Sequence, residues 1–272
     1  MPRELIYVVA LCLLMLVSRV AGSAVHYNIT TKYWDWEFKK NKWAFIDKVA
    51  VERGRNSLIT NIFYSLYGGG QASGEGGKLS KLLDVGCGEA VLSDFLMGAQ
   101  RQQYFGIDIS AEAIKNARKR RASAYSPANP NSINPENLQV VPALDYKPPP
   151  GVSFGAIVFN EMLYYTDYGR VLEHYIPFLE QPSRPQHAGA ATDGPFGALE
   201  GGVSGGQGGV IIISCWYGET NEAMKDGIFK EAHRLLEPVD SMELSGSSWN
   251  QAKPKAPRRK VSFHIEALRV RR

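Results

Sequence analysis

Short apolar runs alternate with amphipathic segments through the middle of the chain. The runs cover residues 82–84, 104–109, 138–143, 154–159 and 210–216. Runs of this kind, bounded by Gly, Pro, Asn or Asp, are typical of parallel strands that are buried on both faces. Apolar residues recur at helical spacing between several of these runs, over residues 91–96, 110–121, 171–179 and 221–236. Strands that alternate with helices indicate an α/β fold with a parallel sheet.

The C-terminal part shows a different pattern, in which apolar and polar residues alternate. Val261, Phe263 and Ile265 alternate with Ser262 and His264, and this period of two is typical of a half-exposed antiparallel strand. Together with residues 239–244, it predicts an antiparallel pair that closes the sheet. We therefore predict a Rossmann-like, doubly wound and mostly parallel sheet of seven strands with an antiparallel last strand.

The remaining segments suggest how the chain is divided. Residues 25–77 are rich in aromatic residues and end in a Gly-rich stretch, so we expect a helical N-terminal cap, with a helix over 57–66, followed by a flexible linker. Residues 78–272 then form the core domain, and 272 residues suffice for one sizeable core. Residues 180–209, rich in Gly, Ala, Ser and Pro, predict a flexible surface insertion.

An uncharged apolar run, residues 5–17, lies near the start of the chain, after Arg3 and Glu4. This run is shorter than the about twenty residues of a membrane span, and small residues follow it. It predicts a signal peptide over residues 1–24 with cleavage after Ser23 or Ala24, and hence the secretory pathway. The alternatives are a signal anchor that associates with a membrane, a buried N-terminal helix, and a cytoplasmic protein if the start of the chain is wrongly assigned.

Charge and cysteine content narrow the chemistry further. The formal net charge of +4 is too small to indicate nucleic-acid binding, and three cysteines do not make a disulfide scaffold. No spacing of His, Cys, Asp or Glu is typical of a metal site. We expect a globular protein that has neither a nucleic-acid partner nor a metal.

A glycine turn follows the first predicted strand, at Gly86-Cys87-Gly88, with Asp84 at the end of the strand. Glycines let the backbone approach a ligand closely, and the segment after them offers free N–H groups. Asp108 ends the next predicted strand, about twenty residues beyond the turn, where nucleotide-binding α/β folds place a ribose-binding carboxylate. The alternative role of Asp108 is an N-terminal charge for the helix that follows.

The details of the turn decide which nucleotide fits. A dinucleotide fingerprint requires Gly or Ala at the position of Val91, which disfavours a dehydrogenase. Leu-Leu-Asp-Val-Gly-Cys-Gly followed by Phe-Gly-Ile-Asp-Ile-Ser instead resembles the class I S-adenosylmethionine-dependent methyltransferases. Phe-Asn-Glu-Met-Leu-Tyr-Tyr at residues 159–165 resembles motif IV of their small-molecule enzymes. The resemblance covers residues 78–216.

The resemblance implies S-adenosylmethionine as the cofactor, held by the glycine turn and the strand ends. The implied cofactor residues are Asp84, Gly86, Cys87, Gly88, Asp108, Ile109, Leu144, Asp145 and Asn160. By the resemblance, Asp84 and the glycine backbone hold the methionine moiety, and Asp108 accepts hydrogen bonds from the ribose. Ile109 and Leu144 then enclose the adenine, whose amino group Asp145 binds. A turn-forming role before three prolines is the alternative for Asp145.

The acceptor side is less readable, because the sulfonium already carries an activated methyl group and the protein must mainly align the acceptor. Glu161 is the candidate for binding an amine or accepting a proton, or else it serves the cofactor's ammonium or the structure. Tyr33, Trp34 and Tyr164 are candidate acceptor contacts; packing of the cap is the alternative for the first two. We expect an enzyme that methylates N or O of a small-molecule acceptor. The alternatives are a protein or lipid methyltransferase of the endomembrane system, and a catalytically silent, membrane-anchored module that binds the cofactor.

Overall fold

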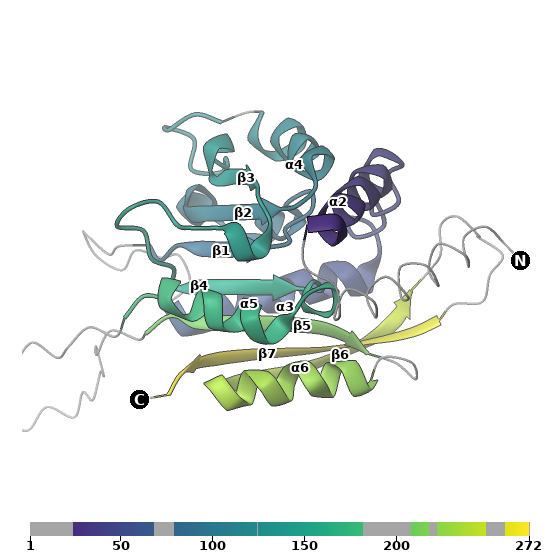
Figure 1. Ribbon diagram of the computed structural model, residues 1–272. Helices are drawn as coiled ribbons and strands as arrows, with labels where there is room; N and C mark the ends of the chain where they lie inside the picture. The colour runs from purple at the N-terminus through teal and green to yellow at the C-terminus, as the bar shows by residue number, and fades with distance from the viewer. Residues whose placement is uncertain are drawn as a thin grey trace, which may run out of the picture.

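The computed structural model describes residues 24–67, 79–123, 125–181, 208–217, 222–248 and 259–271 (Figure 1). The strands are β1 (Leu82–Val85), β2 (Tyr104–Asp108), β3 (Leu138–Val140), β4 (Ala156–Asn160), β5 (Val210–Tyr217), β6 (Leu236–Ser248) and β7 (Arg259–Val270). The α-helices are α2 (Ala24–Lys39), α3 (Ala50–Tyr67), α4 (Ala111–Ala117), α5 (Tyr168–Tyr175) and α6 (Glu222–Leu235). Short helical turns are η1 (Val91–Phe95), η2 (Gly98–Gln103), η3 (Arg118–Ala122), η4 (Pro135–Asn137), η5 (Ala143–Asp145), η6 (Leu163–Tyr165) and η7 (Ile176–Phe178).

The strands form one sheet in the order β3-β2-β1-β4-β5-β7-β6. Strands β1 to β5 are parallel, and Asp84 of β1 lies opposite Gly106 of β2 and Val158 of β4. Strand β7 runs antiparallel between β5 and β6. The predicted mostly parallel, seven-stranded sheet is therefore confirmed. The strand order reverses between β1 and β4, and ligands of open α/β sheets bind outside the carboxyl ends at such a point.

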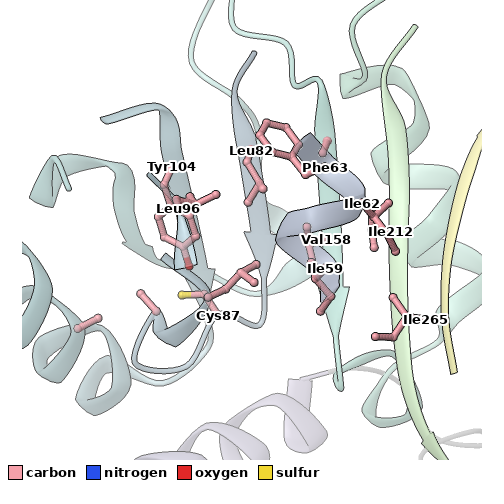
Figure 2. Close-up of a cluster of buried hydrophobic side chains, with 14 of the residues drawn as sticks. Ile59, Ile62, Phe63, Leu82, Cys87, Leu96, Tyr104, Val158, Ile212 and Ile265 are labelled. Carbon is pink, nitrogen blue, oxygen red and sulfur yellow. The ribbon is translucent and has the colours of Figure 1, made fainter. Parts of the chain in front are cut away.

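Helices cover both faces of the sheet. Neighbouring residues of each buried strand point to opposite sides, so both faces are apolar and both need a covering layer. Leu82 faces the layer that contains α3, and Leu83 faces the layer of α5 and α6. Figure 2 shows the first layer, in which Ile59, Ile62 and Phe63 of α3 pack against side chains of β1, β4 and β5. These α3 residues are almost fully buried, and each contributes about 1.5–3 kcal/mol by leaving water.

Several helices differ from their predicted bounds. Residues 91–95 form a 3-10 turn in place of an α-helix, since Ala90 adopts a left-handed conformation with φ 59° and the turn ends at Leu96. The predicted helix over 57–66 begins earlier, at Ala50. The helix after β2 begins as predicted, with the side chain of Ser110 accepting a hydrogen bond from the Ala113 N–H as its N-cap.

Some predictions fall on residues that the structure does not describe. These are the apolar run 5–17, the linker over 68–77 and most of the insertion over 180–209. Among the described residues, no helix combines the length and the hydrophobicity needed to cross a bilayer.

Candidate functional site

A cavity of about 940 Å³ opens at the carboxyl ends of the central parallel strands. Its floor consists of the glycine turn after β1 and the ends of β2, β4 and β5. Its other walls come from α2, from the turn over residues 40–46 and from the first turns of α3; Figure 1 shows α2 beside the ends of β1 and β2. The cavity therefore lies where the strand order reverses, which is the expected ligand site of this fold.

The glycine turn forms the centre of the floor. Gly86 and Gly88 have φ of 73° and 54°, a conformation that residues with a Cβ rarely adopt. A Cβ on Gly86 would lie 2.9 Å from the Met162 Cβ. The N–H groups of Gly86 and Cys87 donate to the Ile107 carbonyl, so the turn is fixed against β2. Cys87 also lines the cavity, and burial raises the pKa of its thiol, as is typical of a structural cysteine.

Asp84 is a buried carboxylate beneath this turn. Its Oδ2 accepts a hydrogen bond of 2.7 Å from the Tyr104 hydroxyl, whereas its Oδ1 is buried without a partner among the described residues. Burial raises the pKa of Asp84 to about 7; the Tyr104 hydrogen bond opposes this shift and the charge of Asp108 adds to it. A buried, half-satisfied acid at a cavity floor is suited to a cationic ligand group, such as an amino-acid ammonium.

Asp108 ends β2 and joins the glycine turn to α4. Its two oxygens accept from the N–H groups of Gly88 and Ser110, each at 2.8 Å. Burial raises the pKa of Asp108 to about 6, although these backbone hydrogen bonds oppose the shift. Because each carboxylate oxygen can accept more than one hydrogen bond, Asp108 retains capacity for a pair of ligand hydroxyls. Ile109, the next residue, also lines the cavity.

Asn160 and Glu161 lie at the end of β4, on the other side of the floor. Glu161 has φ 63°, a strained value for a non-glycine residue. Its carboxylate accepts from the Tyr164 hydroxyl at 2.6 Å, the Ser214 hydroxyl at 3.0 Å and the Trp216 N–H at 3.0 Å. Burial raises the pKa of Glu161, while the nearby Arg55 and these donors lower it. The structure thus holds Glu161 in one fixed orientation.

The structure does not bring Tyr33, Leu144 and Asp145 to the cavity wall. Leu144 and Asp145 lie in η5 and are exposed, because β3 ends at Val140 and the chain turns outward. Val141 and Ala143 line the cavity at this edge instead. Tyr33 packs edge-on against Trp34, with ring centroids 5.3 Å apart. All other predicted site residues, including Trp34 and Tyr164, line the one cavity.

A polar cluster on α3 is part of the wall and was not predicted. Arg55 pairs with Glu52 at 2.8 Å and lies 3.8 Å from Glu161. The Asn160 side chain donates to the Asn56 side chain at 2.9 Å, which ties α3 to the end of β4. The signal in the sequence is that Glu52, Arg55 and Asn56 continue the helical phase of the apolar residues Ile59, Ile62 and Phe63.

His174, His233 and His264 do not line the cavity. His174 contacts the Tyr146 carbonyl at 2.9 Å and His233 contacts Glu266 at 2.8 Å, both away from the cavity. Within the described ranges, no group of three or more His, Cys, Asp or Glu could hold a metal ion.

Comparisons with known proteins agree with this geometry. Residues 77–169 match a protein-family model described as a methyltransferase domain. No curated protein matches the chain by sequence. A structure of the N-methyltransferase NodS from Bradyrhizobium japonicum WM9, in complex with S-adenosyl-L-homocysteine, is similar with a TM-score of 0.57 and 14% identity. The similarity covers 89% of this chain and 99% of that one.

A second similar structure is magnesium protoporphyrin IX methyltransferase (ChlM) from Synechocystis PCC 6803. With bound S-adenosylhomocysteine it gives a TM-score of 0.52 at 13% identity and covers 89% of this chain and 99% of that one. Residues 77–169 thus match a methyltransferase domain, and the chain shares its fold with these two methyltransferase structures. The resemblance noted in the sequence is confirmed.

Proposed function

We propose that the protein is an S-adenosylmethionine-dependent methyltransferase that transfers a methyl group to nitrogen or oxygen of a small-molecule acceptor. One observation carries the proposal: two buried acids, Asp84 and Asp108, flank a glycine turn at the floor of a large cavity. The methyltransferase match over residues 77–169 contains this constellation. The two similar structures, which hold S-adenosylhomocysteine, support the same cofactor.

The residues fit this cofactor in chemistry as well as in position. The unpartnered Oδ1 of Asp84 is suited to the ammonium of the methionine moiety. The glycine turn lets the methionine moiety approach the protein backbone closely. We assign Asp108 to the ribose hydroxyls; Ile109, Val141 and Ala143 line the cavity and would provide an apolar edge for the adenine. Asn160, whose Oδ1 has no partner in the described part of the chain, lies between this region and the acceptor side.

The protein's own contribution to the reaction is alignment and exclusion of water. S-adenosylmethionine supplies an activated methyl group on a sulfonium. α2 and residues 40–46 form part of the cavity wall, Trp34 and Tyr164 both line the cavity, and Tyr164 contacts Glu161. A carboxylate there can bind an amine or accept a proton from a hydroxyl or ammonium, so Glu161 remains the proposed acceptor-side acid.

Calorimetric titration of the full chain tests the cofactor. We expect S-adenosylmethionine to bind and NAD not to bind, because Val91 breaks the dinucleotide fingerprint. Asp108→Ala should weaken binding about tenfold or more, since it removes the acceptor for the ribose hydroxyls. Asp226→Ala, an exposed acid on α6, is the matched control and should bind like the wild type. A folded protein that does not bind S-adenosylmethionine would refute the proposal.

Other functions make different predictions. A catalytically silent module would bind the cofactor but show no turnover, whereas release of S-adenosylhomocysteine with any acceptor would exclude it. A protein or lipid methyltransferase would methylate membrane or polypeptide fractions in preference to small molecules. Methyl transfer from labelled cofactor into each fraction distinguishes these classes.

Residues 5–17 also lead us to propose a secretory or endomembrane location. The N-terminal sequence and the membrane partition of the protein from cells test it. A mature chain that begins at Ala24 or Val25 supports cleavage, a membrane-bound chain that retains residues 1–24 supports an anchor, and an intact chain free of membranes contradicts both.

A further inference from the structure

One face of α3 changes from apolar to polar along its length. Ile59, Ile62 and Phe63 pack on the sheet (Figure 2), and one to two turns earlier the same face carries Glu52 and Arg55, both buried. Buried charges cost free energy unless they are paired, and replacing a buried ion pair by apolar residues is often stabilising. Because the polar end of α3 faces the cavity, a ligand-binding role accounts for these charges better than stability does.

The charges at this end of the cavity do not balance. Arg55 is the cation of the cluster, and it stands between two carboxylates, at 2.8 Å from Glu52 and 3.8 Å from Glu161. The described residues that line the cavity include two further cations, both in the turn that follows α2. Lys42 pairs with Glu37 at 2.7 Å, and Lys40 is exposed. One carboxylate of the cluster therefore lacks a counter-charge.

Glu52 is the carboxylate with the fewest partners. The contact given for its carboxylate among the described residues is the ion pair of its Oε2 with Arg55. By contrast, three donors hold Glu161. Arg55 is itself incompletely satisfied, because its buried Nε has no partner among the described residues while its guanidinium stacks 4.6 Å from the Phe263 ring centre. Among the described residues the polar groups of the cluster are thus only partly satisfied, as expected of a binding site.

The walls around this cluster are aromatic. Trp34 contacts Tyr165 with ring centroids 5.0 Å apart, and Tyr165 contacts Tyr164 at 4.6 Å. Trp216 and Phe263 also line the cavity. Aromatic faces attract cations and accommodate apolar groups, but they do not compensate an anion.

We propose that the acceptor is an amine with an apolar or aromatic body, whose ammonium group binds against Glu52 and Glu161. The inference rests on the proposed methyltransferase function and narrows its acceptor atom to nitrogen. Glu52 takes one proton from the bound ammonium: an N–H bond breaks, an O–H bond forms, and the electron pair stays on nitrogen as the lone pair that methyl transfer requires. Arg55 acts as a positioning residue that keeps the two carboxylates close together.

The test compares three probes of similar shape on the full chain saturated with S-adenosylhomocysteine. The probes are 2-phenylethylamine, 2-phenylethanol and 3-phenylpropanoate, titrated calorimetrically near neutral pH. We expect the amine to bind at least about tenfold more tightly than the alcohol, and the carboxylate to bind weakest, because a buried unpaired anion repels it. Tighter binding of the alcohol or the carboxylate, or no binding by all three, would overturn the inference.

Substitution of Glu52 assigns the preference to the cluster. Glu52→Gln should reduce amine affinity about tenfold or more and leave alcohol affinity within about twofold, and Glu52→Asp should restore part of the preference. Glu173→Gln, which removes an exposed acid outside the cavity, should change neither affinity. An unchanged ratio of amine to alcohol affinity in Glu52→Gln would refute the role of Glu52. The wild-type selectivity remains decisive if that variant does not fold.

Failure of this inference can be distinguished from failure of the proposed function. If S-adenosylhomocysteine binds and the amine is not preferred, the amine inference fails alone. If S-adenosylhomocysteine does not bind the folded chain, both fail.

Discussion

At the scale of single residues, the site depends on positions where a side chain cannot be accommodated. Gly86 has φ 73°, and a Cβ there would meet the Met162 side chain at 2.9 Å. Gly98 also adopts a left-handed conformation, with φ 51°, but a Cβ there has nothing within 4 Å. Substituting each of the two glycines by Ala therefore distinguishes the cost of backbone strain from the cost of a steric clash.

We predict that Gly86→Ala destabilises the protein more than Gly98→Ala does. The left-handed conformation costs an L-residue about 1–2 kcal/mol at either position, and the contact with Met162 adds to this cost only at Gly86. Gly86→Ala should also weaken cofactor binding about tenfold or more, because the turn at the cavity floor must shift. Chemical denaturation and cofactor titration check both effects. Equal losses of stability in the two variants would show that the contact with Met162 is relieved without cost.

At the scale of elements, α2 is held against α4 by one carboxylate. Asp35 accepts from the Ser110 hydroxyl at 2.7 Å and from the Glu112 N–H at 3.1 Å. Ser110 also caps α4 and donates its own N–H to Asp108. The contact of Asp35 with Ser110 thus links α2, a wall of the cavity, to Asp108, the proposed ribose-binding residue.

We predict that Asp35→Ala loosens α2 without unfolding the sheet. Backbone amides of residues 31–39 should exchange with solvent faster, and release of S-adenosylhomocysteine should accelerate severalfold, because Trp34 and Phe38 of α2 line the cavity. Hydrogen exchange and stopped-flow release measure the two effects. Lys39→Ala, at an exposed position at the end of α2, is the control. Unchanged hydrogen exchange in Asp35→Ala would mean that packing, rather than the hydrogen bonds to Asp35, holds α2 in place.

Element bounds also show what the sequence could and could not predict. The strand pattern located the sheet and the turn at Gly86, because buried parallel strands and tight turns have strong local signals. It extended β3 to Ala143, whereas the strand ends at Val140, and it assigned Leu144 and Asp145 to a cavity that Val141 and Ala143 line instead. It also began α3 at Ser57, since polar residues at the start of a helix look like a solvated face. Only the tertiary structure shows that Glu52 and Arg55 are buried.

At the scale of the whole molecule, the carboxyl edge of the sheet concentrates buried acids. Burial raises the pKa of Asp84 to about 7 and of Asp108 to about 6, and it also raises the pKa values of Glu52 and Glu161. A fold with no ligand to bind would gain stability by replacing these acids with neutral residues. Their presence together at one edge is typical of a site that trades stability for function.

The effect of a buried acid on the stability of the ligand-free protein can be measured at Asp84. Because its folded pKa of about 7 exceeds the ordinary value of 3.8, the folded state binds this proton more tightly than the unfolded state does. The stability that Asp84 contributes is therefore complete below about pH 4 and is lost as the pH rises towards 7. We predict that Asp84→Asn stabilises the ligand-free protein by about 1–3 kcal/mol at pH 8 and by less at pH 5.

The same substitution should weaken S-adenosylmethionine binding about tenfold or more at pH 8, because the cofactor ammonium loses its counter-charge. Denaturation at pH 5 and pH 8 measures the change in stability, and cofactor titration at pH 8 measures the change in affinity. Asp226→Asn is the exposed control. A variant that is no more stable at pH 8 would show that Asp84 is already compensated in the free protein. Unchanged cofactor affinity would remove Asp84 from the binding site, and the acid at the end of β1 would then be structural.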